Sequence, residues 1–216
     1  MPAPASIETL RLVHDAEYIA TARRDIEAGR AALSTGDTRV SPESWDAALL
    51  AAGAVCDAVD AVLTGKLRNA FCAVRTPGHH ASPARGMGFC VFNNVAIGAR
   101  HALRARGLDR VLLIDWDVHH GNGTQDAFWK DPAVLQFHIQ ERGIYPGSGK
   151  EGERGAGAAE GQILNIEIER GYDLSALGAS AAATITELEA LGRAVQPKAG
   201  PPSQPAATTE QPIVKP

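Results

Sequence analysis

A chain of 216 residues with 44% hydrophobic and 21% charged residues has the composition of a globular domain, which excludes a mostly disordered protein. Its net charge of -4 argues against binding nucleic acid through global charge, and its apolar runs are too short to cross a bilayer. Three cysteines without a CxxC pair are typical of a reducing compartment. We therefore expect a cytoplasmic protein with no membrane or nucleic-acid partner.

Helices are predicted for most of the first 65 residues. Apolar positions at helical spacing over residues 7–32 predict one or two helices. Ser41-Pro42-Glu43 is typical of a helix start, with the serine as N-cap and the proline at the first helical position. An apolar stripe then runs from Trp45 to Leu63, and Gly65 stands where a C-terminal cap belongs.

Strands and helices alternate in the next part of the chain. A buried strand is predicted over residues 71–75, and a helix from Asn93 or Asn94 to about Arg106 is ended by Gly107. A second buried strand starts at Val111. The further expected elements are a short helix over 125–129, a strand over 134–138, a turn-rich loop over 144–149, a mobile loop over 151–161, a strand over 163–168 and a helix over 174–195. This alternation predicts an α/β fold, a mostly parallel sheet flanked by helices.

The composition changes after residue 196. Residues 197–216 are rich in Pro, Ala, Thr and Gln and carry almost no large apolar side chains. Such a segment buries too little apolar surface to offset the entropy of its chain. We therefore expect one α/β domain over residues 1–196 and a disordered tail over residues 197–216.

Acidic and histidine side chains gather where the strand that starts at Val111 ends. Asp115, Asp117 and His119 stand at alternate positions, so they begin on one face of the strand. Asp and His together are ligands for zinc or a similar divalent ion. Sites in parallel α/β sheets form at the carboxyl ends of strands. The sequence therefore predicts a metal site here rather than a loop of solvated polar residues.

A pair of histidines, His79 and His80, follows the strand predicted over residues 71–75 and can face this metal site across neighbouring strand ends. Hydrolysis by a metal-activated water needs a base for the water proton and an acid for the leaving amine, and two imidazoles can supply both. A carboxylate raises the pKa of a histidine far more than a neutral amide does. Asp115 is therefore a candidate partner for one histidine, and Asn122 is a candidate partner for the other.

Four motifs occur in the same order as in a known family. They are Arg75–Ala81 (RTPGHHA), Gly88–Asn94 (GFCVFNN), Asp115–Thr124 (DWDVHHGNGT) and Tyr145–Gly149 (YPGSG). On these motifs the chain resembles the histone deacetylase and acetylpolyamine amidohydrolase family, from about Val13 to about Gly171. Asn122 in place of an acid makes it resemble the class II branch.

The resemblance implies an arginase-like α/β fold and a zinc hydrolase that removes acetyl groups from acetyl-lysine or acetylpolyamine substrates. Residue by residue, Asp117 and His119 match the zinc ligands. His79 and His80 match the acid/base pair, and Asp115 matches the partner of His79. A catalytic zinc usually has three protein ligands, so these motifs name two of them.

The resemblance also implies a narrow channel for the acyl-bearing chain. Gly88, Phe89 and Tyr145 match its walls, and the two aromatic rings would hold an aliphatic stem by apolar contact. Asp37 matches the loop acid that grips the substrate backbone. A structural monovalent cation, K⁺, is expected near the metal ligands, where Gln136 stands in place of the usual serine.

The motifs of the two ends of the family are not matched. The family's opening strand and first loop have no counterpart in this sequence. The Asp that supplies the family's third zinc ligand after a later strand is also unmatched, and so is the Gly-Gly-Tyr motif. We therefore expect an incomplete deacetylase fold, truncated at both ends, with an unpaired sheet edge that invites association into an oligomer. One alternative is a non-catalytic remnant that folds partly or binds acylated ligands without hydrolysis. Another is a manganese ureohydrolase of the same fold, although its Asp-Ala-His type of metal loop is missing.

Overall fold

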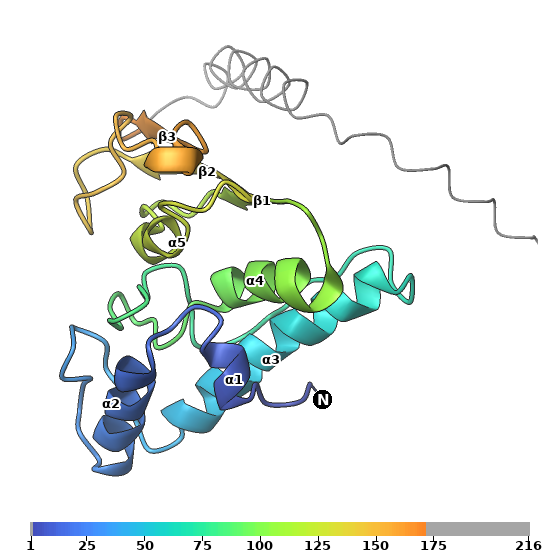
Figure 1. The fold of residues 1–216 in the computed structure, drawn as a ribbon. Coiled ribbons are helices and arrows are strands. Elements are labelled where there is room, and N and C mark those ends of the chain that lie inside the picture. The colour runs from blue at the N-terminus through green and yellow to red at the C-terminus, as the bar shows by residue number, and fades with distance from the viewer. Residues whose placement is uncertain (1, 172–216) are drawn as a thin grey trace, which may run out of the picture. The chain divides into compact units, whose positions relative to one another are not determined.

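Three parallel strands form a small sheet in the order β1-β2-β3 (Figure 1). They are β1 (Val111–Asp115), β2 (Val134–Glu141) and β3 (Ile163–Ile168). β1 pairs with β2 in a register that sets Asp115 opposite His138. The three strands predicted in this part of the chain are confirmed, and so is the parallel α/β arrangement.

The structure is a computed structural model that describes residues 2–171. The helix predicted over residues 174–195 and the tail predicted over residues 197–216 lie outside the described residues, so both stay predictions. The same holds for the domain boundary at residue 196. Between residues 2 and 171, no helix has the length and apolar character that a membrane span requires.

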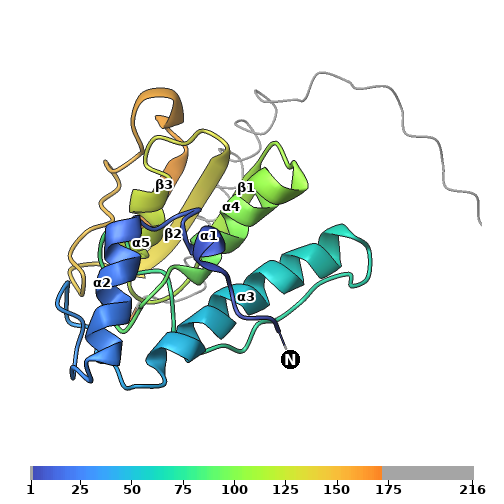
Figure 2. The ribbon, with the colours of Figure 1, turned by 60° about the horizontal axis from the view of Figure 1, so that its bottom comes forward.

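Helices cover one face of the sheet, and most of them come from the first half of the chain. They are α1 (Ile7–Leu10), α2 (Ala16–Glu27), α3 (Ser44–Leu63), α4 (Asn94–Arg106) and α5 (Asn122–Ala127), and a short 3-10 helix, η1, spans Gly157–Ala159. α4 packs on both β1 and α3, and α5 packs on α4. Figure 1 shows α4 and α5 next to the sheet and the first three helices beyond them, and Figure 2 shows α3 running alongside α4. The one or two helices predicted over residues 7–32 are confirmed, as α1 and α2.

The hydrophobic core lies between these layers. One cluster of buried side chains joins the first three helices to the start of α4, and it includes Leu10, Ile26 and Phe92. A second cluster joins α4, α5 and the sheet through Ala99 and Phe128. α4 is held from both sides, so the loop that precedes it has a fixed position.

Asn93 caps α4 and ties it to the loop that follows His80. Its side-chain Oδ1 accepts from the Ala96 N–H at 3.1 Å, and its Nδ2 donates to the Ala81 carbonyl at 3.0 Å. At the other end Gly107 takes the left-handed conformation that ends a helix. The predicted helix and both of its ends are therefore confirmed.

Replacing Asn93 by alanine is expected to lower the free energy of unfolding by about 2–4 kcal/mol, because it removes the N-cap and leaves a buried carbonyl without its donor. Urea unfolding followed by circular dichroism measures the loss. Val95→Ala, on the exposed side of the same turn, is the matched control and should change stability by no more than about 0.5 kcal/mol. Equal losses in the two variants would show that the cap does not hold this loop.

Residues 71–75 do not form the predicted strand. The segment pairs with no strand of the described chain, and Phe71 is 94% exposed. Apolar and β-branched residues favour extended backbone, but a strand is stable only when a neighbouring strand takes up its hydrogen bonds. The prediction is therefore wrong for the residues that the structure describes, although the loop after it does reach the site.

β1 is less buried than its apolar sequence predicts. Leu112 and Ile114 are 49% and 52% exposed, and Trp116 just beyond the strand is 80% exposed. A continuous apolar run is typical of a strand that is covered on both faces. Within residues 2–171, helices cover only the face that carries Val111 and Leu113.

Two helices also begin at other residues than those predicted from the sequence. α3 begins at Ser44 and not directly after Ser41, because the Ser41 N–H donates to the Ser44 hydroxyl in a turn (2.9 Å). α5 covers Asn122–Ala127, three residues before the predicted start. The C-terminal end of α3 is as predicted, with Gly65 at a positive φ of 73° just after the helix.

Candidate active site

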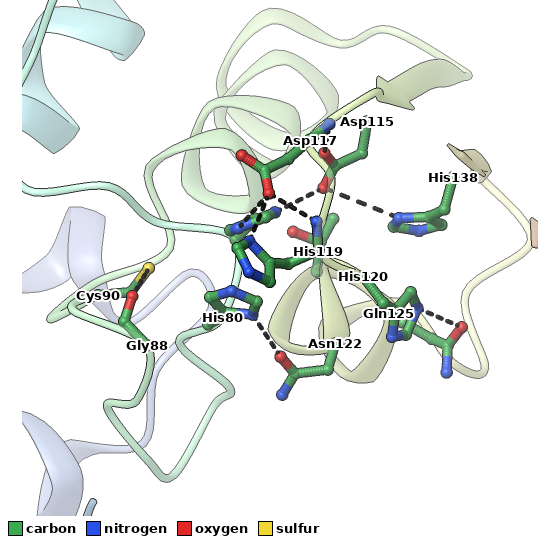
Figure 3. Close-up of polar contacts among 12 residues, drawn as sticks. His80, Gly88, Cys90, Asp115, Asp117, His119, His120, Asn122, Gln125 and His138 are labelled. Atoms are coloured by element: carbon green, nitrogen blue, oxygen red, sulfur yellow. Dashed lines mark hydrogen bonds and ion pairs between the residues drawn. The ribbon is translucent and has the colours of Figure 1, made fainter. Parts of the chain in front are cut away.

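Asp115, Asp117 and His119 are joined by hydrogen bonds where β1 ends. The Asp117 N–H donates to Asp115 Oδ1 at 3.1 Å, and the His119 N–H donates to Asp117 Oδ1 at 2.8 Å. β1 itself ends at Asp115, so the alternate positions continue into a loop that these side-chain bonds hold in place. Figure 3 shows the three residues together at the carboxyl end of the strand, as expected from the sequence.

Asp117 and His119 bring donor atoms to one place. His119 Nδ1 lies 3.1 Å from Asp117 Oδ1, and the two side chains are 42% and 49% exposed. A carboxylate oxygen and an imidazole nitrogen that converge in this way fit two positions of a zinc site. Over residues 2–171, no group of three or more His, Cys, Asp or Glu side chains is arranged to hold a metal ion. The described residues therefore bring together two candidate ligands, one fewer than a catalytic zinc usually has.

His79 is paired with a carboxylate. Its Nδ1 lies 2.9 Å from Asp115 Oδ2, and the two side chains are only 16% and 18% exposed. Burial alone would lower the pKa of His79, but the hydrogen bond to Asp115 and its negative charge outweigh burial and raise that pKa. Burial likewise favours a higher pKa for Asp115, and the bond to His79 outweighs it, so the pKa of Asp115 is lowered. The pair favours the charged form of both partners.

His80 is paired with an amide instead. Its Nδ1 lies 2.8 Å from Asn122 Oδ1, and the residue is buried. Because an amide oxygen can only accept, Nδ1 carries the proton and Nε2 keeps a free lone pair. Burial and the neighbouring charge of His79 lower the pKa of His80 to about 4, against a weaker opposing effect of Asn122. The predicted division of the two histidines between Asp115 and Asn122 is confirmed.

Two glycines let the loop after β1 approach the histidine pair closely. A Cβ on Gly121 would overlap the Asp115 carboxylate, and a Cβ on Gly123 would overlap the Ala81 carbonyl. The Thr124 N–H also donates to the His79 carbonyl at 3.1 Å. Segments about 40 residues apart in sequence are thereby locked together, and this contact sets the distances within the site.

Asp37 connects the two walls of the predicted channel. Its Oδ1 accepts from the Gly88 N–H at 2.8 Å, and its Oδ2 accepts from the Tyr145 hydroxyl at 3.2 Å. Burial and the negative charge of Asp37 raise the pKa of Tyr145 to about 12, so its hydroxyl stays protonated. Asp37 therefore contacts two of the residues predicted to form the channel.

Of the two aromatic residues predicted for the channel, Tyr145 borders the histidines. The Tyr145 ring stands edge-on to His80 and to His119, with centroid distances of 5.0 and 6.1 Å. Phe89 is 68% exposed and has a positive φ of 64°. An exposed ring beside the loop of Gly88 leaves apolar surface that a ligand can cover.

His138 is a member of the site that sequence analysis missed. It lies opposite Asp115 on β2, is 1% exposed, and has its Nδ1 3.8 Å from Asp115 Oδ2. Gln136, which the resemblance places where the family's cation site has a serine, lies opposite Leu113 on β2. The monovalent cation itself stays a prediction. The sequence signal that could have identified His138 is the row of polar residues at alternate positions of an apolar strand.

Phe89, Arg39 and Arg75 are among the residues that line a cleft of about 590 Å³. Neither the histidine pair nor the two metal donors line it. The catalytic candidates are therefore grouped by direct contacts with one another rather than by this cleft.

Comparison with known proteins identifies the family. The family profile described as the histone deacetylase domain matches residues 1–198. The chain is 41% identical over 177 residues to "Histone deacetylase 14, chloroplastic" of Arabidopsis thaliana, covering 77% of this chain and 42% of the relative. It is 48% identical over 148 residues to "Polyamine deacetylase HDAC10" of Rattus norvegicus, covering 65% of this chain and 25% of the relative. A crystal structure of the HDA15 HD domain matches with a TM-score of 0.74 and 36% identity, over 77% of this chain and 49% of that one.

The chain therefore belongs to the histone deacetylase family, as its motifs predict. The small parallel sheet and its helices form an incomplete version of the α/β deacetylase fold. The chain spans less than half of the length of these relatives. The family assignment leaves the manganese ureohydrolase alternative without support.

Proposed function

We propose that the chain carries the acid/base half of a zinc-dependent amidohydrolase that removes acetyl groups from acetyl-lysine or acetylpolyamine substrates. One observation carries the proposal: two adjacent histidines have different partners, Asp115 and Asn122, beside two converging metal donors. Relatives named histone deacetylase and polyamine deacetylase support this substrate class. A zinc ion bound at Asp117 and His119 would supply a Lewis acid that polarises the amide carbonyl and activates water.

The two histidines can move the protons that amide hydrolysis requires. His80 holds a lone pair on Nε2 because its Nδ1–H is bonded to Asn122, so His80 is suited to take a proton from the attacking water. His79 is bonded to a carboxylate, which stabilises its protonated form, so His79 is suited to hold positive charge near the amide. Breaking the C–N bond then requires a proton on the leaving amine, and the histidine pair can return it.

The channel residues would select an extended aliphatic chain. Asp37 links Tyr145 to Gly88, the neighbour of the exposed Phe89, and these two aromatic residues would supply the apolar surface. A neutral acylated chain can cover this surface without bringing a charge near the rings. The second carboxylate oxygen of Asp37 also faces the Tyr145 hydroxyl, which holds that wall in position. Asp37 would therefore hold the channel residues in position, and its contact with a substrate backbone stays a prediction.

A second candidate function is binding of acylated ligands without hydrolysis. The observation in its favour is that, in the described part of the chain, only two residues converge as metal donors. Two protein ligands would hold a zinc ion weakly, and the histidines alone do not supply the Lewis acid that the ion would provide. The oligomeric state, the cytoplasmic location and the absence of nucleic-acid and membrane partners stay proposals of the sequence analysis.

The proposed function is tested by acetate release from an acetyl-lysine peptide and from an acetylated polyamine, each incubated with the purified chain and added zinc. We expect slow release that requires zinc and that a hydroxamate chelator abolishes. Because the described residues provide two ligands, the rate should be marginal compared with a complete enzyme of the family. Binding of the acetylated peptide without any zinc-dependent release would favour the second candidate.

A further inference from the structure

His138 is buried beside the pair formed by His79 and Asp115, and none of the steps derived above uses it. Its Nδ1 lies 3.8 Å from Asp115 Oδ2, the same oxygen that bonds to His79, and makes no hydrogen bond. Its Nε2 lies 3.2 Å from Gln136 Oε1, and Gln136 is 0% exposed. Figure 3 shows His138 facing Asp115 from the neighbouring strand. A fully buried polar ring without a partner on one side calls for a physical reason.

The ring of His138 is neutral and carries a single proton. Burial lowers its pKa to about 4, so near pH 7 only one of the two nitrogens is protonated. With the proton on Nε2, the lone pair of Nδ1 would face the negative oxygen of Asp115, which is repulsive. With the proton on Nδ1, an N–H dipole faces that oxygen, and the interaction is attractive.

The side chain of Gln136 can accommodate the second arrangement. With its oxygen toward His138, the buried Gln136 Nε2 has no hydrogen-bond partner. A half-turn of the amide brings Nε2–H toward His138 Nε2, so the amide donates to the ring and only a carbonyl oxygen is left unpaired. An unpaired buried carbonyl oxygen is tolerated more often than an unpaired N–H group.

We propose that Gln136 holds His138 in the tautomer with its proton on Nδ1, so that this N–H faces Asp115 Oδ2 and fixes the carboxylate against His79. Asp115 is then oriented by three groups, because its Oδ1 also accepts from the Asp117 N–H. His138 is thus a positioning residue that acts through Asp115. Its value for catalysis rests on the proposed function, whereas the tautomer itself does not.

The tautomer is measured by long-range ¹H–¹⁵N correlation spectra of the histidine rings in the full chain of residues 1–216, without metal. The neutral ring of His138, assigned through its backbone, should show a protonated Nδ1 and an unprotonated Nε2. Gln136→Leu removes the donor to Nε2 and should lower the fraction with protonated Nδ1. A protonated Nε2 with a bare Nδ1 in the unmodified chain would overturn the proposal, whatever the variants do.

The positioning role is tested on the Nδ1 proton of His79, whose resonance reports the bond to Asp115. His138→Phe keeps a buried ring but cannot donate, so this resonance should shift or be lost through faster exchange with water. Gln140→Leu is the matched control, because Gln140 lies on the same face of β2 and its amide donates to the Gly149 carbonyl. It should leave the His79 resonance in place. An unshifted resonance in His138→Phe, or equal shifts in both variants, would overturn the role. None of these readouts depends on zinc or turnover, so failure of the proposed function would leave them valid.

Discussion

Replacing either His79 or His80 by alanine is expected to reduce acetate release about 10²–10⁴-fold, because each variant removes a group that moves or stabilises a proton in the reaction. Zinc binding should stay unchanged, since neither histidine belongs to the converging donor pair. Acetate release and zinc content are measured on the same preparations. His79→Ala should also leave Asp115 without its partner, so this variant is expected to lose some stability as well.

His101→Ala is the matched control for both variants. His101 lies on α4 and contacts Asp60 at 2.7 Å, away from the donor pair. Its replacement removes a partly buried histidine without touching the site, so acetate release should stay at the level of the parent chain. Loss of zinc from His79→Ala or His80→Ala would contradict the assigned roles, because it would make that histidine a ligand.

Asp117→Ala and His119→Ala are each expected to weaken zinc binding by more than about 100-fold. Loss of a residue that only supports a ligand already costs about 10–100-fold in affinity, and these two are proposed to be the ligands themselves. The effect is large because the described residues supply no third donor that could take over. Metal analysis after dialysis, together with titration by a competing chelator, measures the change.

Asp109→Ala serves as the control for this pair, since Asp109 is an exposed acid that precedes β1. It lowers the negative charge of the same segment without removing a donor, and it should retain the zinc affinity of the parent. Retention of zinc by both Asp117→Ala and His119→Ala would mean that the metal binds elsewhere in the chain.

The helix α4 and the sheet could be predicted because their signals are local. Asn93 and Gly107 are cap residues whose preferences follow from their own chemistry, and the structure confirms both ends of the helix. The grouping of Asp115 with His79 could also be predicted, because side chains at the ends of neighbouring segments of an α/β fold converge at one edge. The family resemblance added that Asp115 is the partner of His79, and Asn122 was the candidate partner of the other histidine.

The other features of the fold and the site depend on contacts between distant parts of the chain, which a local sequence pattern does not encode. Residues 71–75 have the composition of a strand, yet whether a strand forms depends on a neighbour that the described chain does not provide. The position of His138 depended on the register between β1 and β2, and a shift by two residues would have put Gln136 opposite Asp115. The exposure of Leu112 and Ile114 likewise depends on which elements pack on the strand, and not on the sequence of the strand itself.

The most direct test of the account is a zinc titration of the purified chain of residues 1–216, with stoichiometry and affinity measured against a competing chelator. We expect one zinc per chain, bound weakly enough for a moderate chelator to remove it, because two donors converge where three are usual. Zinc that stays bound through dialysis against a strong chelator would contradict it, since a complete ligand set would then exist. Failure to bind any zinc would contradict it equally, because Asp117 and His119 would then not form a metal site.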